Sequence, residues 1–138
     1  LDKYFNIQYF KSKIKNRKKN IKNFITDQSL VSGIGNIYAN EILYYSKINP
    51  TKQVIYLNDK EIKTIIIYSK SVLKKAIRKG GSSIRDFKNI KGKSGSYQNE
   101  FRVYDREGKK CLRSNCLGTI SRIVISNRST FLCKYCQK

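Results

Sequence analysis

The sequence lacks histidine, methionine and tryptophan, and its 138 residues include one proline and only nine acidic side chains. Without histidine, catalytic dyads and metal sites that depend on an imidazole are excluded. No apolar run approaches the roughly 20 residues that a membrane-spanning helix needs, and the first residues do not resemble a signal peptide. The length suits one domain or two small ones, and we expect a monomer with no membrane partner.

The positive charge of the sequence is its most prominent compositional feature. Thirty lysines and arginines against nine acidic residues give a formal net charge of +21. Seven basic side chains lie between residues 11 and 22 with no acidic residue among them, and such a density disfavours an isolated helix. A bias toward A/T-rich codons explains part of the lysine excess. The remainder favours a polyanionic partner, with nucleic acid first and an anionic membrane second.

Apolar spacing predicts helices in the first half of the chain. Residues 1–28 are predicted to be helical, because Ile21, Phe24, Ile25 and Gln28 repeat at helical spacing after the basic run. The glycines within 33–35 interrupt the pattern, which resumes at Ile37 and stops at Pro50.

A third helix has the clearest boundaries. Asn58 is its predicted cap, with Glu61 three residues later, and Gly80-Gly81 is its predicted end. Its predicted buried stripe consists of Ile62, Ile65, Ile66, Ser69, Val72, Leu73, Ala76 and Ile77.

The chain changes character after this helix. Residues 80–99 are rich in glycine and serine and are too long for a simple connection, which favours a functional loop or a linker. Beyond them, 101–104, 119–125 and 130–132 alternate like strands. We therefore expect a mainly α fold with a small β tail: a helical domain over 1–99, which includes the loop of about 80–99, and a β-hairpin domain over 100–138.

Four cysteines lie in this tail. Cys111 and Cys116 are separated by four residues and Cys133 and Cys136 by two, with sixteen residues between the pairs. So short a β-rich tail buries too little apolar area to be stable alone, and four thiolates can hold one tetrahedral zinc ion. Two disulfides, or a redox pair at Cys133 and Cys136, are the alternatives. We expect one structural zinc, since four thiolates leave no position for a water molecule.

Two further motifs are candidates for binding phosphate. Gly33-Ile34-Gly35-Asn36 lies between predicted helices, where glycines allow a ligand to approach the backbone and the next helix begins with free N–H groups. The alternative is a simple tight corner. Arg128 is predicted to project from the tip of a hairpin, because Asn127 is a typical turn residue. Its planar guanidinium suits phosphate, and the alternative is a solvated arginine.

Three segments resemble one known family. The run 27–41 is similar to the helix–two-turn–helix signature of formamidopyrimidine-DNA glycosylases, and 80–87 is similar to the start of their lesion-capping loop. Residues 128–137 resemble the end of their zinc finger. The resemblance extends over essentially the whole chain in the same order, and the loop favours the purine-lesion branch over endonuclease VIII proteins.

The resemblance implies a bacterial, cytoplasmic base-excision repair enzyme that acts on duplex DNA, associated with the nucleoid through DNA binding. Such an enzyme is a DNA glycosylase and abasic-site lyase that removes oxidised purines, namely 8-oxoguanine and formamidopyrimidines. The residues that it implies for phosphate contacts are Asn36, Arg128 and Tyr104, with Gly33 and Gly35 in the turn. Those implied for the loop over the extruded base are Ser82, Ser83, Arg85 and Tyr97.

The sequence also departs from this family. The first cysteine pair is more widely spaced than in many members, and Asp105 and Asn127 stand where glycine is frequent. The family uses an N-terminal proline amine as nucleophile with a following glutamate, whereas this sequence starts Leu1-Asp2-Lys3 and its one proline is Pro50. We therefore expect a part that binds DNA without catalysing, and an N-terminal catalytic domain of the same protein as its partner.

Two other classes of protein fit some of the features. A non-enzymatic zinc-ribbon protein of ribosomal or transcription type would explain the cysteines and the charge, but not the glycine turn or the Gly/Ser loop. A basic helix over 1–25 that lies on a membrane surface would explain the charge alone.

Overall fold

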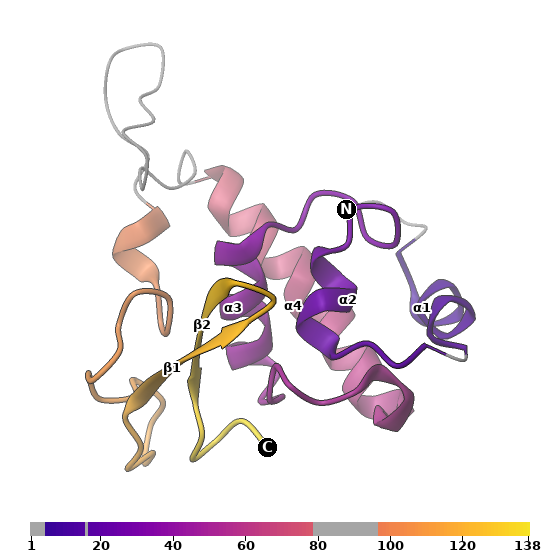
Figure 1. Ribbon diagram of the computed structural model, residues 1–138. Coiled ribbons are helices and arrows are strands. Elements are labelled where there is room, and N and C mark those ends of the chain that lie inside the picture. Colours follow the sequence, from indigo (N-terminus) through magenta and orange to yellow (C-terminus); the bar gives the residue numbers. More distant parts are fainter. Residues whose placement is uncertain (1–4, 16, 79–96) are drawn as a thin grey trace.

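The computed structural model describes residues 5–15, 17–78 and 97–138. The elements of this described part are helices α1 (Ile7–Ile14), α2 (Ile21–Thr26), α3 (Asn36–Tyr45) and α4 (Asp59–Arg78), 3-10 turns η1 (Val54–Tyr56) and η2 (Tyr97–Glu100), and strands β1 (Ile120–Ile125) and β2 (Arg128–Cys133). Helix α3 packs against α2, α4 and β2, whereas α1 packs against α4 on the other side of the bundle (Figure 1). The predicted mainly helical fold with a small β tail is confirmed.

The helix predicted over residues 1–28 is not continuous in the described part of this range. Two short helices stand there instead, each with an asparagine cap: Asn6 accepts from the Tyr9 N–H at 2.9 Å, and Asn20 accepts from the Asn23 N–H at 2.7 Å. The break coincides with the basic run, where like charges oppose a helix and asparagine side chains compete for backbone groups. Because α2 ends at Thr26, Gln28 lies in the following turn.

Helix α4 begins as the sequence predicts. The Asn58 side chain accepts from the Glu61 N–H at 2.8 Å, and the Glu61 carboxylate accepts from the Asn58 N–H at 2.9 Å, which is a capping box. The predicted stripe faces the core except at Ile77, which is 80% exposed because it is rotated about 100° from the buried Ala76. The predicted end at Gly80-Gly81 lies outside the described residues.

The tail contains one antiparallel hairpin, in which Ile125 pairs with Arg128 and Ile120 with Cys133. Ser126 and Asn127 turn the chain with φ of 50° and 64°, as a two-residue hairpin turn requires. The strand predicted over 101–104 is wrong, because the main-chain N–H groups of 102–104 bond to a side chain of α3 rather than to another strand.

Two apolar clusters stabilise this arrangement. The larger lies among the helices, and the smaller surrounds the cysteines and includes Tyr44 of α3. Of the predicted loop residues, Ser82, Ser83 and Arg85 lie outside the described part, and Tyr97 is described only through its backbone in η2. No helix of the described part is both long and apolar enough to span a bilayer.

Candidate nucleic-acid interface and metal site

The N-terminus of α3 meets the hairpin at Asn36. The Asn36 amide Nδ2 donates to the main-chain carbonyl of Ser129 at 3.2 Å, although the two residues are 93 positions apart. Ser129 directly follows Arg128, the exposed first residue of β2. Two residues predicted from separate motifs to contact phosphate thus lie at one junction.

The turn before α3 leaves its backbone accessible. Gly33 has a φ of +97°, which requires glycine, whereas Gly35 is the N-cap of α3 with an ordinary φ of −90°. At both positions a Cβ would meet no described atom within 4 Å. The side chain of Gln28 closes the turn by accepting from the Gly33 N–H at 2.9 Å and donating to the Ile34 carbonyl at 3.1 Å. An anion can approach such a helix N-terminus.

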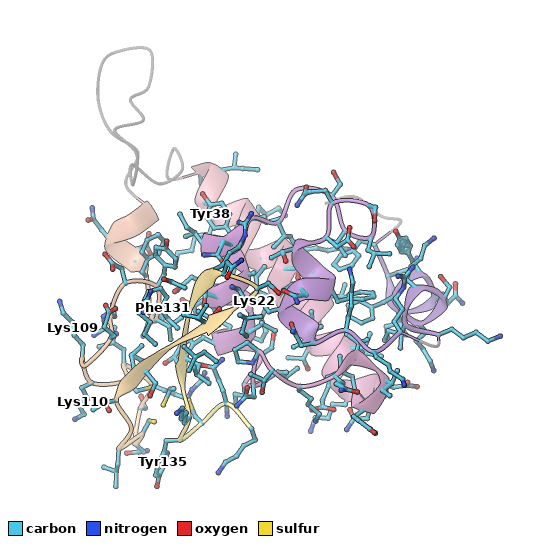
Figure 2. The ribbon with its side chains drawn as sticks, viewed as in Figure 1. Lys22, Tyr38, Lys109, Lys110, Phe131 and Tyr135 are labelled. Atoms are coloured by element: carbon cyan, nitrogen blue, oxygen red, sulfur yellow. The ribbon has the colours of Figure 1, made fainter. Side chains whose placement is uncertain are left out.

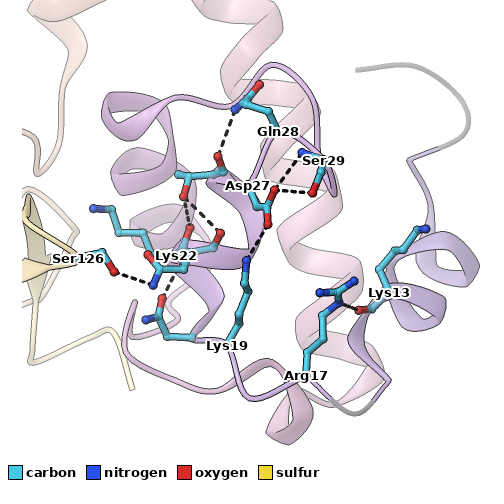
Figure 3. Close-up of polar contacts among 11 residues, drawn as sticks. Lys13, Arg17, Lys19, Lys22, Asp27, Gln28, Ser29 and Ser126 are labelled. Atoms are coloured by element: carbon cyan, nitrogen blue, oxygen red, sulfur yellow. Dashed lines mark hydrogen bonds and ion pairs between the residues drawn. The ribbon is translucent and has the colours of Figure 1, made fainter.

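Lys22 is the least expected residue of this junction. It comes from α2, is 2% exposed and donates through Nζ to the Thr130 hydroxyl at 2.7 Å. Burial lowers the pKa of Lys22 to about 8, and the positive charge of Arg128 adds to this effect. Figure 2 labels Lys22 beside the hairpin, and Figure 3 labels Ser126 of the hairpin turn beside α2. The Ser126 hydroxyl accepts at 2.9 Å from Nδ2 of Asn23, which follows Lys22 in the sequence.

Asn40, one turn after Asn36, fixes the register of the hairpin on α3. It is fully buried, and its Oδ1 accepts from the Phe131 N–H at 2.7 Å. Its Nδ2 donates to the Asn36 carbonyl at 2.8 Å, within the same helix. Asn40 could not be predicted from the sequence, because a polar residue in a helix gives no sign of a distant backbone partner.

Glu41 was also missed, and it holds the segment that carries Tyr104. The buried carboxylate accepts from the N–H groups of Arg102, Val103 and Tyr104 at 2.7, 3.0 and 2.9 Å. Burial raises the pKa of Glu41, and the three N–H groups oppose that rise. The ring of Tyr104 meets those of Phe101 and Phe131 edge-on, with centroids 5.5 and 5.0 Å away. Tyr104 therefore packs directly behind β2.

The four cysteines gather at the other end of β2. Their Sγ atoms all lie within 4.8 Å of one another, and those of Cys116 and Cys133 are 3.6 Å apart. A tetrahedral zinc ion with Zn–S bonds of about 2.3 Å needs sulfurs about 3.8 Å apart, so this cluster fits the ion. Burial alone would raise the pKa of Cys111, but hydrogen bonds from the Tyr44 hydroxyl and the Arg113 N–H bring it to about 7, which favours the zinc-binding thiolate.

The hairpin thus carries its two candidate sites at opposite ends. Arg128 is the first residue of β2 and lies beside α2 and the start of α3, whereas Cys133 is its last residue and lies beside the other cysteines. Figure 2 shows the same separation, with Lys22 near one end of the strands and Tyr135 near the other.

Comparisons with known proteins agree with this geometry. A family model described as the formamidopyrimidine-DNA glycosylase H2TH domain matches residues 1–88, and one described as a zinc finger found in FPG and IleRS matches 108–138. Together with the clustered cysteines, the second match identifies a site for one structural zinc ion.

Individual relatives and solved structures match nearly the whole chain. A formamidopyrimidine-DNA glycosylase of Rickettsia bellii is 47% identical over 97% of this chain and 48% of its own length, and one of Roseobacter denitrificans is 44% identical over 90% and 44%. A complex of Lactococcus lactis Fpg with DNA that contains an abasic site aligns with a TM-score of 0.88 and 38% identity, over 97% of this chain and 48% of that one. The chain spans about half the length of the curated relatives that it matches.

Proposed function

Because this chain belongs to the formamidopyrimidine-DNA glycosylase family, we propose that it binds damaged duplex DNA in base-excision repair. Its ligands are duplexes with oxidised purines, such as 8-oxoguanine and formamidopyrimidines, or with abasic sites. The L. lactis Fpg that it resembles has been solved with abasic-site DNA and with Fapy-dG containing DNA. The repair reaction is glycosidic cleavage followed by abasic-site lysis.

The contact between Asn36 and Ser129 is the observation that carries this proposal. It brings together an accessible glycine turn, a helix N-terminus and the exposed guanidinium of Arg128, which are three different donors for phosphate oxygens. The Asn36 Oδ1 is buried and has no hydrogen-bond partner in the described part of the chain, so Nδ2 is the atom of this amide that can donate to a phosphate oxygen. In this proposal Tyr104 lies near the same stretch of DNA backbone. The residues Ser82, Ser83, Arg85 and Tyr97 cover the extruded base.

We also propose that these 138 residues bind DNA without cleaving it. The family resemblance implies a proline amine as the nucleophile, and the one proline of the sequence, Pro50, is buried in a turn. Lys22 has a lowered pKa, but its amine is buried against Thr130 and is not free to attack a sugar. An N-terminal catalytic half supplies the nucleophile and is the partner that completes the reaction.

Fluorescence anisotropy with an abasic-site duplex over a series of salt concentrations tests the binding proposal. Affinity should fall with a log–log slope of about −0.9 for each phosphate neutralised. Arg128→Ala should weaken binding and reduce that slope by about one unit, and Asn36→Ala should weaken binding with little change in slope. Lys60→Ala is the control, since Lys60 is exposed in the first turn of α4. An ion pair between Lys11 and Asp59 connects this turn to α1. Equal effects of Arg128→Ala and Lys60→Ala would contradict the proposed interface.

Two further measurements separate the alternatives. Structured RNA that binds as tightly as the abasic duplex, or more tightly, would favour a zinc-ribbon protein that assembles on RNA. Incubation with an 8-oxoguanine duplex should release no base, and release by the purified chain would contradict the proposal that the nucleophile comes from elsewhere.

A further inference from the structure

The turn between the first two cysteines carries an arginine that reaches α3. Arg113 lies in this turn of four residues, and its guanidinium donates to the Tyr44 carbonyl at 2.5 Å. Tyr44 is in the last turn of α3, where the helix dipole favours a cation, and its carbonyl also accepts from the Lys47 N–H at 3.1 Å. The guanidinium carbon also lies 4.4 Å from the centroid of the Tyr44 ring, which is a cation–π contact.

Tyr44 continues this connection to the metal site. Its ring is buried, with 2% of the residue exposed, and its hydroxyl lies 3.3 Å from Cys111 Sγ. Once zinc is bound, that sulfur is a thiolate and can only accept, so the hydroxyl must be the donor. The same side chain therefore contacts a zinc ligand with its hydroxyl and Arg113 with its ring face.

Arg113 itself retains an unused donor. Its Nε is buried and has no hydrogen-bond partner among the described residues, although the guanidinium lies beside the Cys136 thiol. One zinc ion with four thiolates carries a net charge of −2, whereas four neutral thiols carry none. A half-buried cation with a free, buried N–H is better matched to the zinc-loaded cluster than to the metal-free one.

We propose that Arg113 and Tyr44 are positioning residues of the zinc centre, which offset part of its negative charge and fix it to the C-terminal end of α3. Arg113 is the second of the four residues in this turn, and its carbonyl accepts from the Cys116 N–H at 3.1 Å. A second tie runs through buried Gln137, which accepts from the Cys133 N–H at 2.8 Å and donates to the Ile48 carbonyl at 3.0 Å. Because this tie remains, loss of the pair should weaken zinc retention without abolishing the fold.

The rate of zinc release to an excess of a coloured chelator tests the role of Arg113. Arg113→Met keeps the length of the side chain and removes its charge and donors, and it should release zinc about tenfold faster than the unmodified chain. Lys134→Met is the matched control, because it removes one cation between the second pair of zinc ligands, Cys133 and Cys136. Lys134 is exposed and makes no hydrogen bond or ion pair within the described part. Equal release rates for Arg113→Met and Lys134→Met would overturn the proposal.

Tyr44→Phe provides an independent test that spares the fold, because it removes only the hydroxyl. In the cobalt-substituted protein, loss of a donor to the Cys111 thiolate should shift the thiolate-to-cobalt charge-transfer band, whereas Tyr45→Phe should leave it in place. Zinc release from Tyr44→Phe should also be faster than from Tyr45→Phe. An unshifted band together with an unchanged release rate would overturn the proposal, even if Arg113→Met failed to fold.

Discussion

The ammonium group of Lys22 donates to the hydroxyl of Thr130 over 2.7 Å, and this bond joins α2 to β2 across 108 positions of sequence. Both side chains are almost fully buried, at 2% and 0% exposure. An unpaired ammonium group would be costly at such a site, so the hydroxyl of Thr130 stabilises the buried amine and the amine fixes the hairpin against the helices. The position of Arg128, two residues before Thr130, depends on this bond.

Thr130→Val should destabilise the protein although valine has nearly the shape of threonine. The buried Lys22 amine would lose its acceptor, which costs about 1–3 kcal/mol. Urea unfolding of the zinc-loaded protein measures the change in the free energy of unfolding. Thr119→Val is the control, since Thr119 is exposed next to β1 and its hydroxyl makes no hydrogen bond within the described part. Equal losses in the two variants would contradict the importance of the bond between Lys22 and Thr130.

The same lysine should make stability depend on pH in the alkaline range. Burial, with the charge of Arg128, lowers the pKa of Lys22 from 10.5 to about 8. Between these two values the unfolded chain holds a proton that the folded chain has released, so the free energy of unfolding rises as the pH rises. Urea unfolding at several pH values within this window should show the rise, and Lys22→Met should lack it. Lys60→Met should keep it, because Lys60 is exposed.

The parts of the fold that could be predicted depend on residues close together in sequence. The capping box joins Asn58 to Glu61 and the hairpin turn needs only Ser126 and Asn127, so both follow from local chemistry. The zinc site could be predicted for the same reason, because each cysteine pair is closely spaced. Asn36 and Arg128 could be named only because each lies in a motif of its own.

The parts that could not be predicted depend on partners distant in sequence. Asn40 bonds to a main-chain group 91 positions away, and Glu41 bonds to three that lie 61 to 63 positions away. The segment 101–104 alternates like a strand, but the N–H groups of 102–104 bond to the Glu41 carboxylate and not to another strand. A pattern within one segment shows which side chains face inward and not which distant group meets them.

Glu41→Gln should destabilise the protein more than the small change in shape suggests. The carboxylate accepts three N–H bonds with two oxygens, whereas an amide has one oxygen and would turn its NH₂ group toward backbone donors. Each buried donor left unpaired costs about 1–3 kcal/mol. Thermal unfolding measures the loss, with Glu107→Gln as the exposed control of the same chemistry. If both variants unfold at the same temperature, the three N–H bonds do not contribute to stability as the structure indicates.

Gly118→Ala should impair zinc binding although alanine adds only a methyl group. A Cβ at position 118 would lie 2.7 Å from Cys133 Sγ and 2.7 Å from the Cβ of Tyr135, closer than such atoms can approach. The cysteine would have to move, and the four sulfurs would leave the tetrahedral spacing that zinc needs. Elemental analysis after dialysis should give one zinc per chain for the unmodified protein and less than one for Gly118→Ala. Gly35→Ala is the control for zinc content, because its methyl group would meet no described atom within 4 Å. A full complement of zinc in Gly118→Ala would mean that the backbone at Gly118 can move away from Cys133 without disturbing the metal site.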